Sequence, residues 1–271
     1  MADADQRKRV ARWAIDSESR ARLDNALALA RDLAPIADPG DQWDLDPWLL
    51  GCANGVLDLR TGVLRDGRWL WPTATWKDWD GVAMNGMKAI ALVSTDRGQT
   101  WPEYLNVLDQ YNRGVFSWEQ SIVQLPDDRL LQVAWAYIEA TGHHEPTPYT
   151  ISADGRTFSA PRPTGLKGQT TKLHVLPDGT VLALYRRDDK PGLWANRCRI
   201  DGDDWVNLEE QLVWDGAPSG MAGEGRGADE LVDLQFGFPQ MVDLPSGGVF
   251  AVLWGQEDDV RNIRWFRIRV T

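Results

Sequence analysis

Two adjacent arginines have the residue type and spacing to bind an anionic ligand. Arg186 and Arg187 directly follow the apolar strand expected over 180–185. A planar guanidinium group binds a carboxylate through two parallel hydrogen bonds, so the pair could contact an acid group. The same two residues could instead form a solvated loop pair with Asp188 and Asp189. The sequence leaves both interpretations open.

A histidine pair is the second combination with chemical potential. His143 and His144 precede Glu145, and together they could ligate a metal ion. His174 is the third and last histidine of the chain. We therefore interpret the pair as part of a loop, and we expect no metal ion and no other cofactor.

The segment 94–101 reads S-T-D-R-G-Q-T-W and predicts a tight turn between two strands. Asp96 can accept hydrogen bonds from backbone N–H groups of its own turn, and Gly98 can adopt a positive φ without steric cost. Trp101 can then fold back as an apolar plug. The residues expected to build this turn are Ser94, Asp96, Gly98, Thr100 and Trp101.

A longer pattern, Leu-x-Asp-Gly-x-apolar-apolar, begins at Leu64, Leu125 and Leu176 and more weakly at Leu244. Each copy predicts a strand, a turn and a second strand. The octet at 94–101 has weaker counterparts at 152–158 and 201–205. Four strands in a repeat of roughly 50 residues are typical of a β-propeller blade, so we predict an all-β fold with about four blades.

The blades are expected at 67–116, 117–167, 168–232 and 233–271. The first blade lacks its innermost strand unless 63–65 supplies it. An arc of four blades has an uncovered sheet at each end, and such surfaces promote association. We therefore expect the protein to self-associate through its open propeller edges.

The first 66 residues differ in kind from the rest. Apolar residues at helical spacing predict a short α-helix over 6–34, which Pro35 ends. An extended segment over 48–59 follows, and Asn54-Gly55 within it indicates a hairpin. The chain is thus expected to consist of a helical N-terminal segment, 1–66, and a region of blades, 67–271.

Composition limits the classes of partner. The formal net charge is −11, which argues against nucleic acid as the main partner, and no apolar run is long enough to span a membrane. The N-terminus lacks the apolar core of a signal peptide, so we expect a cytoplasmic protein. Cys52 and Cys198 are the only cysteines, and they could form one bridge or remain two free thiols.

The octet and the repeated pattern together resemble the sialidase (neuraminidase) family over residues 66–271. That family consists of six-bladed propellers whose outer turns carry the Asp-box, also called the BNR repeat. The octet at 94–101 matches this box in full. The resemblance implies a glycoside hydrolase that acts on terminal sialic acid or a related acidic sugar.

The resemblance also implies roles for individual residues. A retaining sialidase uses arginines for the substrate carboxylate, an aspartic acid as general acid and a tyrosine nucleophile assisted by a glutamate. Glu119 matches the position of the assisting glutamate, and Phe238 stands near the position of the tyrosine. The residues expected to contact substrate are Arg186, Arg187, Trp135 and Gln240. Tyr149 and Tyr185 could take the place of the nucleophilic tyrosine, but they are better explained as aromatic residues of the blade core. The resemblance therefore implies an incomplete catalytic set.

The segment 44–62 resembles the N-terminal region of phage and plasmid primase–helicases. The phosphate-binding motif of their ATPase is missing, since the nearest run, 165–171, lacks the Lys–Ser/Thr ending. We therefore interpret the chain as a fusion of two unrelated parts.

Three functions stay open at this stage. The first is a sialidase-like hydrolase or its truncated descendant. The second is a non-catalytic propeller that binds a glycan or a protein, and the third is DNA binding by the N-terminal segment. The tryptophans at 69, 71, 76 and 79 mostly predict blade packing, although one or two could form a platform for a sugar ring.

Overall fold

The computed structural model describes residues 49–52, 55–58, 63–96, 98–187, 189–215, 234–257 and 260–270. Side chains are described from residue 67 onward, that of Glu257 excepted. The chain divides into two compact units, Met1–Arg65 and Asp66–Thr271. The helix predicted over 6–34 lies outside the described residues.

The N-terminal unit contains a small antiparallel sheet. Its strands, in sheet order, are β1 (Leu49–Cys52), β2 (Gly55–Asp58) and β3 (Val63–Asp66). Cys52 pairs with Gly55, so the predicted hairpin is present. The pattern at Leu64–Leu70 contains both of its predicted strands, β3 and β4 (Trp69–Ala74), but they do not form a hairpin, because β4 pairs with β5 (Ala89–Ser94) of another sheet. The segment 63–65 therefore does not supply an inner strand for the next sheet.

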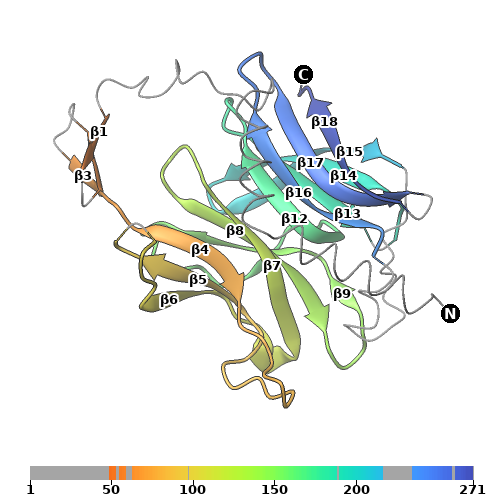
Figure 1. The fold of residues 1–271 in the computed structure, drawn as a ribbon, viewed down its shortest axis with the longest axis horizontal. Helices are drawn as coiled ribbons and strands as arrows, with labels where there is room; N and C mark the ends of the chain where they lie inside the picture. The colour runs from red at the N-terminus through yellow and green to blue at the C-terminus, as the bar shows by residue number, and fades with distance from the viewer. Residues whose placement is uncertain are drawn as a thin grey trace, which may run out of the picture. The chain divides into compact units, whose positions relative to one another are not determined.

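The second unit consists of four antiparallel sheets (Figure 1). The first sheet contains β4 (Trp69–Ala74), β5 (Ala89–Ser94) and β6 (Glu103–Leu108). The second contains β7 (Val115–Gln124), β8 (Leu130–Ile138), β10 (Pro148–Ser152) and β11 (Arg162–Pro163), with β9 (His144–Glu145) beside β8. The third contains β12 (Gly168–Val175), β13 (Val181–Arg187), β14 (Leu193–Asp201) and β15 (Asp204–Trp214). The fourth contains β16 (Phe236–Asp243), β17 (Val249–Glu257) and β18 (Val260–Ile268).

The repeated leucine pattern forms the same turn in three sheets. The N–H of Leu125, Leu176 and Leu244 donates to the carbonyl four residues later, at 2.8, 2.8 and 2.9 Å. The third residue after each leucine has φ of 70°, 82° and 83°, respectively. Glycine fills this left-handed position in the last two turns and Asp128 in the first, because aspartate tolerates it better than most residues. The pattern thus predicted three of its four turns correctly.

One strand at the end of each sheet lies next to the corresponding strand of the following sheet. These strands are β4, β7, β12 and β16, and each contacts the next along the series. Apolar side chains fill the space between consecutive sheets. The largest cluster, between the second and third sheets, includes Leu131, Tyr149 and Tyr185. A second, between the third and fourth sheets, includes Leu184 and Phe236.

The 3₁₀ turn η1 (Tyr111–Arg113) precedes β7 and is the only helical element among the described residues. No described helix is long and apolar enough to cross a membrane. Cys198 is a free thiol in the core, so it does not form the bridge that the sequence left open.

Candidate functional site

Three of the four strands at the sheet ends carry a bulge near their start. The register shifts between Trp118 and Ser121 in β7, and between Gln169 and Lys172 in β12. It shifts in the same way between Gly237 and Gln240 in β16. The spacing is identical in all three strands, so the bulge is a repeated feature of the sheets.

The second residue of each bulge has a positive φ although it is not a glycine. The values are 46° at Glu119, 54° at Thr170 and 50° at Phe238. This left-handed region costs about 1–3 kcal/mol for a non-glycine residue, and a β-branched threonine is among the least suited to it. A bulge also changes the direction of side chains, which in a regular strand would alternate between the two faces of the sheet. The same strain thus recurs at three equivalent positions, which makes these side chains candidates for a functional site.

The first two bulges meet across the sheets. The Thr170 hydroxyl donates to Glu119 Oε2 at 3.0 Å. Burial raises the pKa of the Glu119 carboxyl above its usual range. The positive charges of Arg186 and Lys172 and the bond from Thr170 oppose that rise without cancelling it. Glu119 is therefore a desolvated carboxyl group held beside two cations.

Arg186 lies in β13 and is 2% exposed. Its Nε donates to Gln169 Oε1 at 2.9 Å and its Nη1 to the Phe236 carbonyl at 3.0 Å. The guanidinium carbon lies 5.4 Å from the centre of the Trp135 ring, a cation–π contact. Burial lowers the pKa of Arg186 to about 10, and the charge of Glu119 limits that fall.

Gly237 makes room for this guanidinium. A Cβ at position 237 would lie 2.6 Å from Arg186 Nη1, closer than side-chain atoms approach one another. The first residue of the third bulge therefore has to be small while Arg186 keeps its place.

Lys172 is the second cation near Glu119. Its Nζ donates to the Gln120 carbonyl at 2.9 Å and lies 5.4 Å from the centre of the Phe238 ring. Burial lowers the pKa of Lys172, and Glu119 opposes the shift. We call the group formed by Glu119, Thr170, Lys172, Arg186 and Phe238 the bulge site. It holds two cations and one carboxylate and therefore has a net positive charge.

The bulges also tie the sheets together. The Gln120 amide donates to the carbonyl groups of Ile90, at 2.6 Å, and Thr73 in the first sheet. The Leu173 N–H donates to Ser121 Oγ at 3.1 Å. These bonds hold the side chains of the bulge site in a fixed frame.

The structure brings together part of the set predicted from the sequence. Glu119, Arg186 and Trp135 are neighbours, as the contacts above describe. Arg187 points to a different group, because strand neighbours face opposite sides. Gln240 is exposed at the end of the third bulge.

The alternative of a solvated arginine loop pair is wrong, since Arg186 and Arg187 both lie inside β13 and are 2% and 8% exposed. Arg187 donates to both carboxylate oxygens of Asp189, at 2.7 and 2.9 Å, and to Glu210 at 2.7 Å. The hydroxyl of Tyr185 donates to the same Glu210 carboxylate. Burial, followed by Glu210, raises the pKa of Tyr185 well above its usual range, which makes this phenol a poor nucleophile.

Sequence reasoning missed Thr170 and Lys172. They lie in the run Gly168–Leu173, where nothing in the residue types marks a bulge. A lysine between threonine and leucine in a buried strand was the only available signal. The role of Thr170 follows only from the structure, in which its hydroxyl lies within hydrogen-bond distance of Glu119.

The segment 94–101 forms a closed network of hydrogen bonds. The Ser94 hydroxyl donates to Asp96 Oδ1 at 2.7 Å and accepts the Gly98 N–H at 2.7 Å. The N–H and hydroxyl of Thr100 donate to Asp96 at 2.8 and 2.6 Å. These bonds, led by the hydroxyl of Thr100, lower the pKa of Asp96 to about 2. Gly98 has φ of 81°, and a Cβ there would lie 3.2 Å from the Trp69 ring.

The second turn repeats part of this network. Asp154 Oδ1 accepts the N–H groups of Arg156 and Thr157 at 2.8 and 2.7 Å and the Ser152 hydroxyl at 3.0 Å. The third, at 201–205, is a two-residue hairpin in which Asp201 pairs with Asp204. It is tied to the second sheet, since Arg129 Nη1 donates to the Gly202 carbonyl at 2.7 Å.

One ring nitrogen of His144 is held by a neighbouring tryptophan. Its Nδ1 accepts the Trp135 indole N–H at 2.9 Å. No group of three or more His, Cys, Asp or Glu side chains among the described residues could hold a metal ion. The loop expected for the histidine pair is present at His143, whereas His144 lies in β9.

The four clustered tryptophans are largely exposed, at 52%, 55%, 59% and 106% for Trp69, Trp71, Trp76 and Trp79. Trp71 packs edge-on against Trp101 and Trp76 stacks on Trp118, at centroid distances of 5.5 and 4.8 Å. Each of these two rings thus packs on one side and faces solvent on another.

The sequence and the fold can be compared with known proteins. Residues 1–69 match the family model described as D5 N terminal like. This match covers the segment that the sequence separates from the blades. No curated protein matches the chain.

Several solved structures resemble about three quarters of the chain. A protein of unknown function from Dyadobacter fermentans is 22% identical, with a TM-score of 0.55 over 75% of this chain and 51% of its own. The NanB sialidase from Streptococcus pneumoniae is 14% identical, with a TM-score of 0.48 over 75% and 29%. A GH43 β-1,3-galactosidase is 10% identical, with a TM-score of 0.44 over 76% and 50%. The chain thus spans about half or less of the length of these proteins, and the likeness to the first concerns the fold alone.

Proposed function

We propose that residues 66–271 form four blades of a sialidase-like β-propeller that binds an acidic sugar of the sialic acid class at the bulge site. The repetition of antiparallel sheets along β4, β7, β12 and β16 supports the blade interpretation. The network around Asp96 supports the interpretation of 94–101 as an Asp-box, and the turn at 152–158 is its weaker copy.

The observation that carries the proposal is the recurrence of strained bulges around two cations, the buried Arg186 and the partly exposed Lys172. Inner-strand bulges with positive φ at Glu119, Thr170 and Phe238 belong to three different sheets. They surround Lys172 and Arg186, whose two charges exceed the single charge of Glu119. A monoanionic ligand would neutralise that excess in a place that water screens poorly.

Binding without turnover is the function that the geometry supports best. Glycoside hydrolysis in most families uses two carboxyl groups, and sialidases use a tyrosine in place of one. Glu119 is the carboxyl group of the bulge site, and the third bulge offers Phe238, which has no oxygen. Tyr185 is engaged with Glu210 and has a raised pKa.

Retained hydrolysis is the second candidate, and one observation favours it. A general acid requires a carboxyl group whose pKa is raised by burial, and the pKa of Glu119 is raised in this way. Glu119 would then protonate a leaving group rather than assist a tyrosine.

The experiment that separates the two candidates pairs binding with turnover. A fluorogenic sialoside is incubated with the wild type and with Glu119→Gln between pH 5 and 7, and binding of N-acetylneuraminic acid is measured in parallel. We expect saturable binding with no release of fluorophore. Release that is lost in Glu119→Gln would establish the second candidate, and the absence of both binding and release would refute the proposal.

A further inference from the structure

The fourth sheet ends in β18, whose outer edge pairs with no other described strand (Figure 1). The third sheet has a further strand at the corresponding position, β15, and the second sheet has β11. β18 is nine residues long, and the backbone N–H and C=O groups of alternate residues point outward along it. An edge of this kind can accept one more strand.

The side chains of β18 alternate between two environments. Phe266 packs on the cluster between the third and fourth sheets, whereas Ile263 and Trp265 are largely exposed. The Trp265 ring stacks on Phe250 of β17 at a centroid distance of 5.8 Å. The exposed face of β18 thus has a basic residue on each side of two apolar ones, in the order Arg261, Ile263, Trp265 and Arg267.

This edge is positively charged, although the chain as a whole has a formal net charge of −11. Arg261 Nε donates to Gln256 Oε1 at 3.3 Å, and Arg267 Nη2 donates to Ser246 Oγ at 2.7 Å. Both acceptors are neutral, and no carboxylate among the described side chains forms an ion pair with either arginine. The two charges are therefore available to an acidic ligand.

A second copy of the chain fits this edge poorly. Antiparallel pairing of two β18 strands over their whole length would place Arg261 opposite Arg267 and Arg264 opposite its own copy. Like charges directly opposite each other destabilise a pair of strands. The charges of the edge thus favour an acidic segment of another protein over a second copy.

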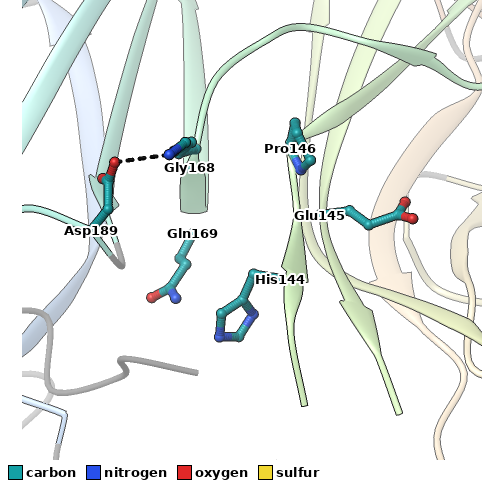
Figure 2. Close-up of a pocket in the computed structure, with 7 residues that line it drawn as sticks. His144, Glu145, Pro146, Gly168, Gln169 and Asp189 are labelled. Carbon is teal, nitrogen blue, oxygen red and sulfur yellow. Dashed lines mark hydrogen bonds and ion pairs between the residues drawn. The ribbon is translucent and has the colours of Figure 1, made fainter. Parts of the chain in front are cut away.

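A hollow of about 110 Å³ lies beside the end of β18. Ile268 and Val270 line it on one side, and side chains of β13, β14 and β15 line it on the other. It is separate from the pocket that His144 and Gln169 line next to the bulge site (Figure 2). Side chains of an added strand that point toward the third sheet would have room in this hollow.

We propose that the outer edge of β18 binds an extended, acidic segment of a partner protein, which adds a fourth strand to the fourth sheet. Backbone hydrogen bonds would supply affinity, and the exposed side chains of β18 would supply specificity. Residues directly opposite each other in paired strands lie on the same face of the sheet. The segment therefore carries acidic residues opposite Arg261 and Arg267 and apolar residues opposite Ile263 and Trp265. Its two acidic residues are six positions apart, with apolar residues at the second and fourth positions after the first of them.

None of these residues belongs to the bulge site, so the inference does not depend on the proposed function. The test uses the full chain and a fluorescein-labelled peptide, E-T-V-T-V-T-E, whose ends are blocked. Fluorescence anisotropy at low ionic strength should show saturable binding. The same peptide with N-methyl groups on two adjacent central residues keeps its side chains but loses a backbone donor toward β18. It should bind roughly tenfold more weakly.

Charge reversal tests the specificity. Arg261→Glu and Arg267→Glu should each weaken binding of the acidic peptide about five- to tenfold, because each replaces an attractive cross-strand pair by a repulsive one. The peptide K-T-V-T-V-T-K should bind the double variant and not the wild type. Arg113→Glu changes an exposed arginine of η1 and should leave the affinity for the acidic peptide unchanged. Urea unfolding of each variant checks that the fold is intact.

Three results would overturn the inference. The first is the absence of saturable binding by the wild type. The second is equal affinity for the N-methylated and the parent peptide, and the third is equal affinity in Arg261→Glu, Arg267→Glu and the wild type. Dimers of the wild type that Arg267→Glu alters and the peptide does not displace would assign the edge to a second copy, which would also overturn the inference.

Discussion

Replacing Glu119 by glutamine should stabilise the protein at neutral and alkaline pH. Glutamine has nearly the same shape and keeps an oxygen for the Thr170 hydroxyl, which now lies 3.0 Å from Glu119 Oε2. It removes the buried negative charge, whose desolvation is the largest cause of the raised pKa. Arg186 and Lys172 lose a counter-charge, but their effect on Glu119 is smaller than that of burial, so the net change should favour the folded state.

The pH dependence gives the sign and the size of the effect. The folded protein binds the Glu119 proton more tightly than the unfolded chain, whose glutamate has the ordinary pKa of 4.5. The stabilisation from this group is therefore complete below pH 4.5 and is lost as the pH rises through the folded-state pKa. The loss amounts to about 1.4 kcal/mol for each unit by which burial raises the pKa. Glu119→Gln should equal the wild type near pH 4 and exceed it progressively above that pH.

Urea unfolding followed by tryptophan fluorescence at pH 4.5, 6, 7 and 8 measures this difference. Glu103→Gln removes an exposed carboxylate from β6 and controls for the change in net charge. An advantage of the wild type over Glu119→Gln that grows with pH would refute the reasoning, because it would mean that the cations outweigh burial. A residue that lowers the stability of the folded protein is best explained by a role in binding or catalysis.

Three further predictions concern the packing at Arg186, the turn around Asp96 and the exposed strand β18. Gly237→Ala should lower the free energy of unfolding by about 1–3 kcal/mol, because its Cβ would lie 2.6 Å from Arg186 Nη1. Gly255→Ala is the matched control, since its nearest neighbour is 3.6 Å away, and equal losses in the two variants would contradict the packing argument. Asp96→Ala should remove a contribution to stability that, in the wild type, is present above pH 3.8 and lost as the pH falls toward 2. Urea unfolding of both proteins between pH 2 and 5 tests this. The same dependence of stability on pH in the variant and the wild type would contradict it. Two apolar residues on β18 are largely exposed, Ile263 at 67% and Trp265 at 64%. They should promote self-association, and Trp265→Arg should reduce it, as measured by sedimentation. A wild type that sediments as a monomer at all concentrations would contradict this.

The repeated turns were predictable because their chemistry is local. The leucine pattern predicted the turns after Leu125, Leu176 and Leu244, where a hydrogen bond and one left-handed residue define the geometry. The same pattern failed at Leu64, because pairing between strands is decided by contacts distant in sequence. Val63–Asp66 pairs in the N-terminal sheet, and no local feature of its residues distinguishes the two outcomes.

The candidate site was predictable only in part. The family resemblance led to Glu119, and residue type led to Arg186. Neither could show that Arg186 is buried on the Trp135 ring while Arg187 faces Asp189 and Glu210, since that follows from the strand continuing through both residues. The positive φ of Thr170 and Phe238 could not be predicted from the sequence either, because these residue types usually avoid it.

The most direct test of the bulge site is the affinity for N-acetylneuraminic acid in a Lys172 variant. Lys172 is partly exposed, so Lys172→Met changes the charge facing a ligand with less damage to the fold than a change at the buried Arg186. Isothermal titration at pH 7 should show that Lys172→Met weakens binding at least roughly tenfold, the loss expected for one charged hydrogen bond. Lys190→Met, an exposed lysine beside Trp194, should bind as the wild type does. Equal affinity in wild type and Lys172→Met, or no binding by the wild type, would contradict the account.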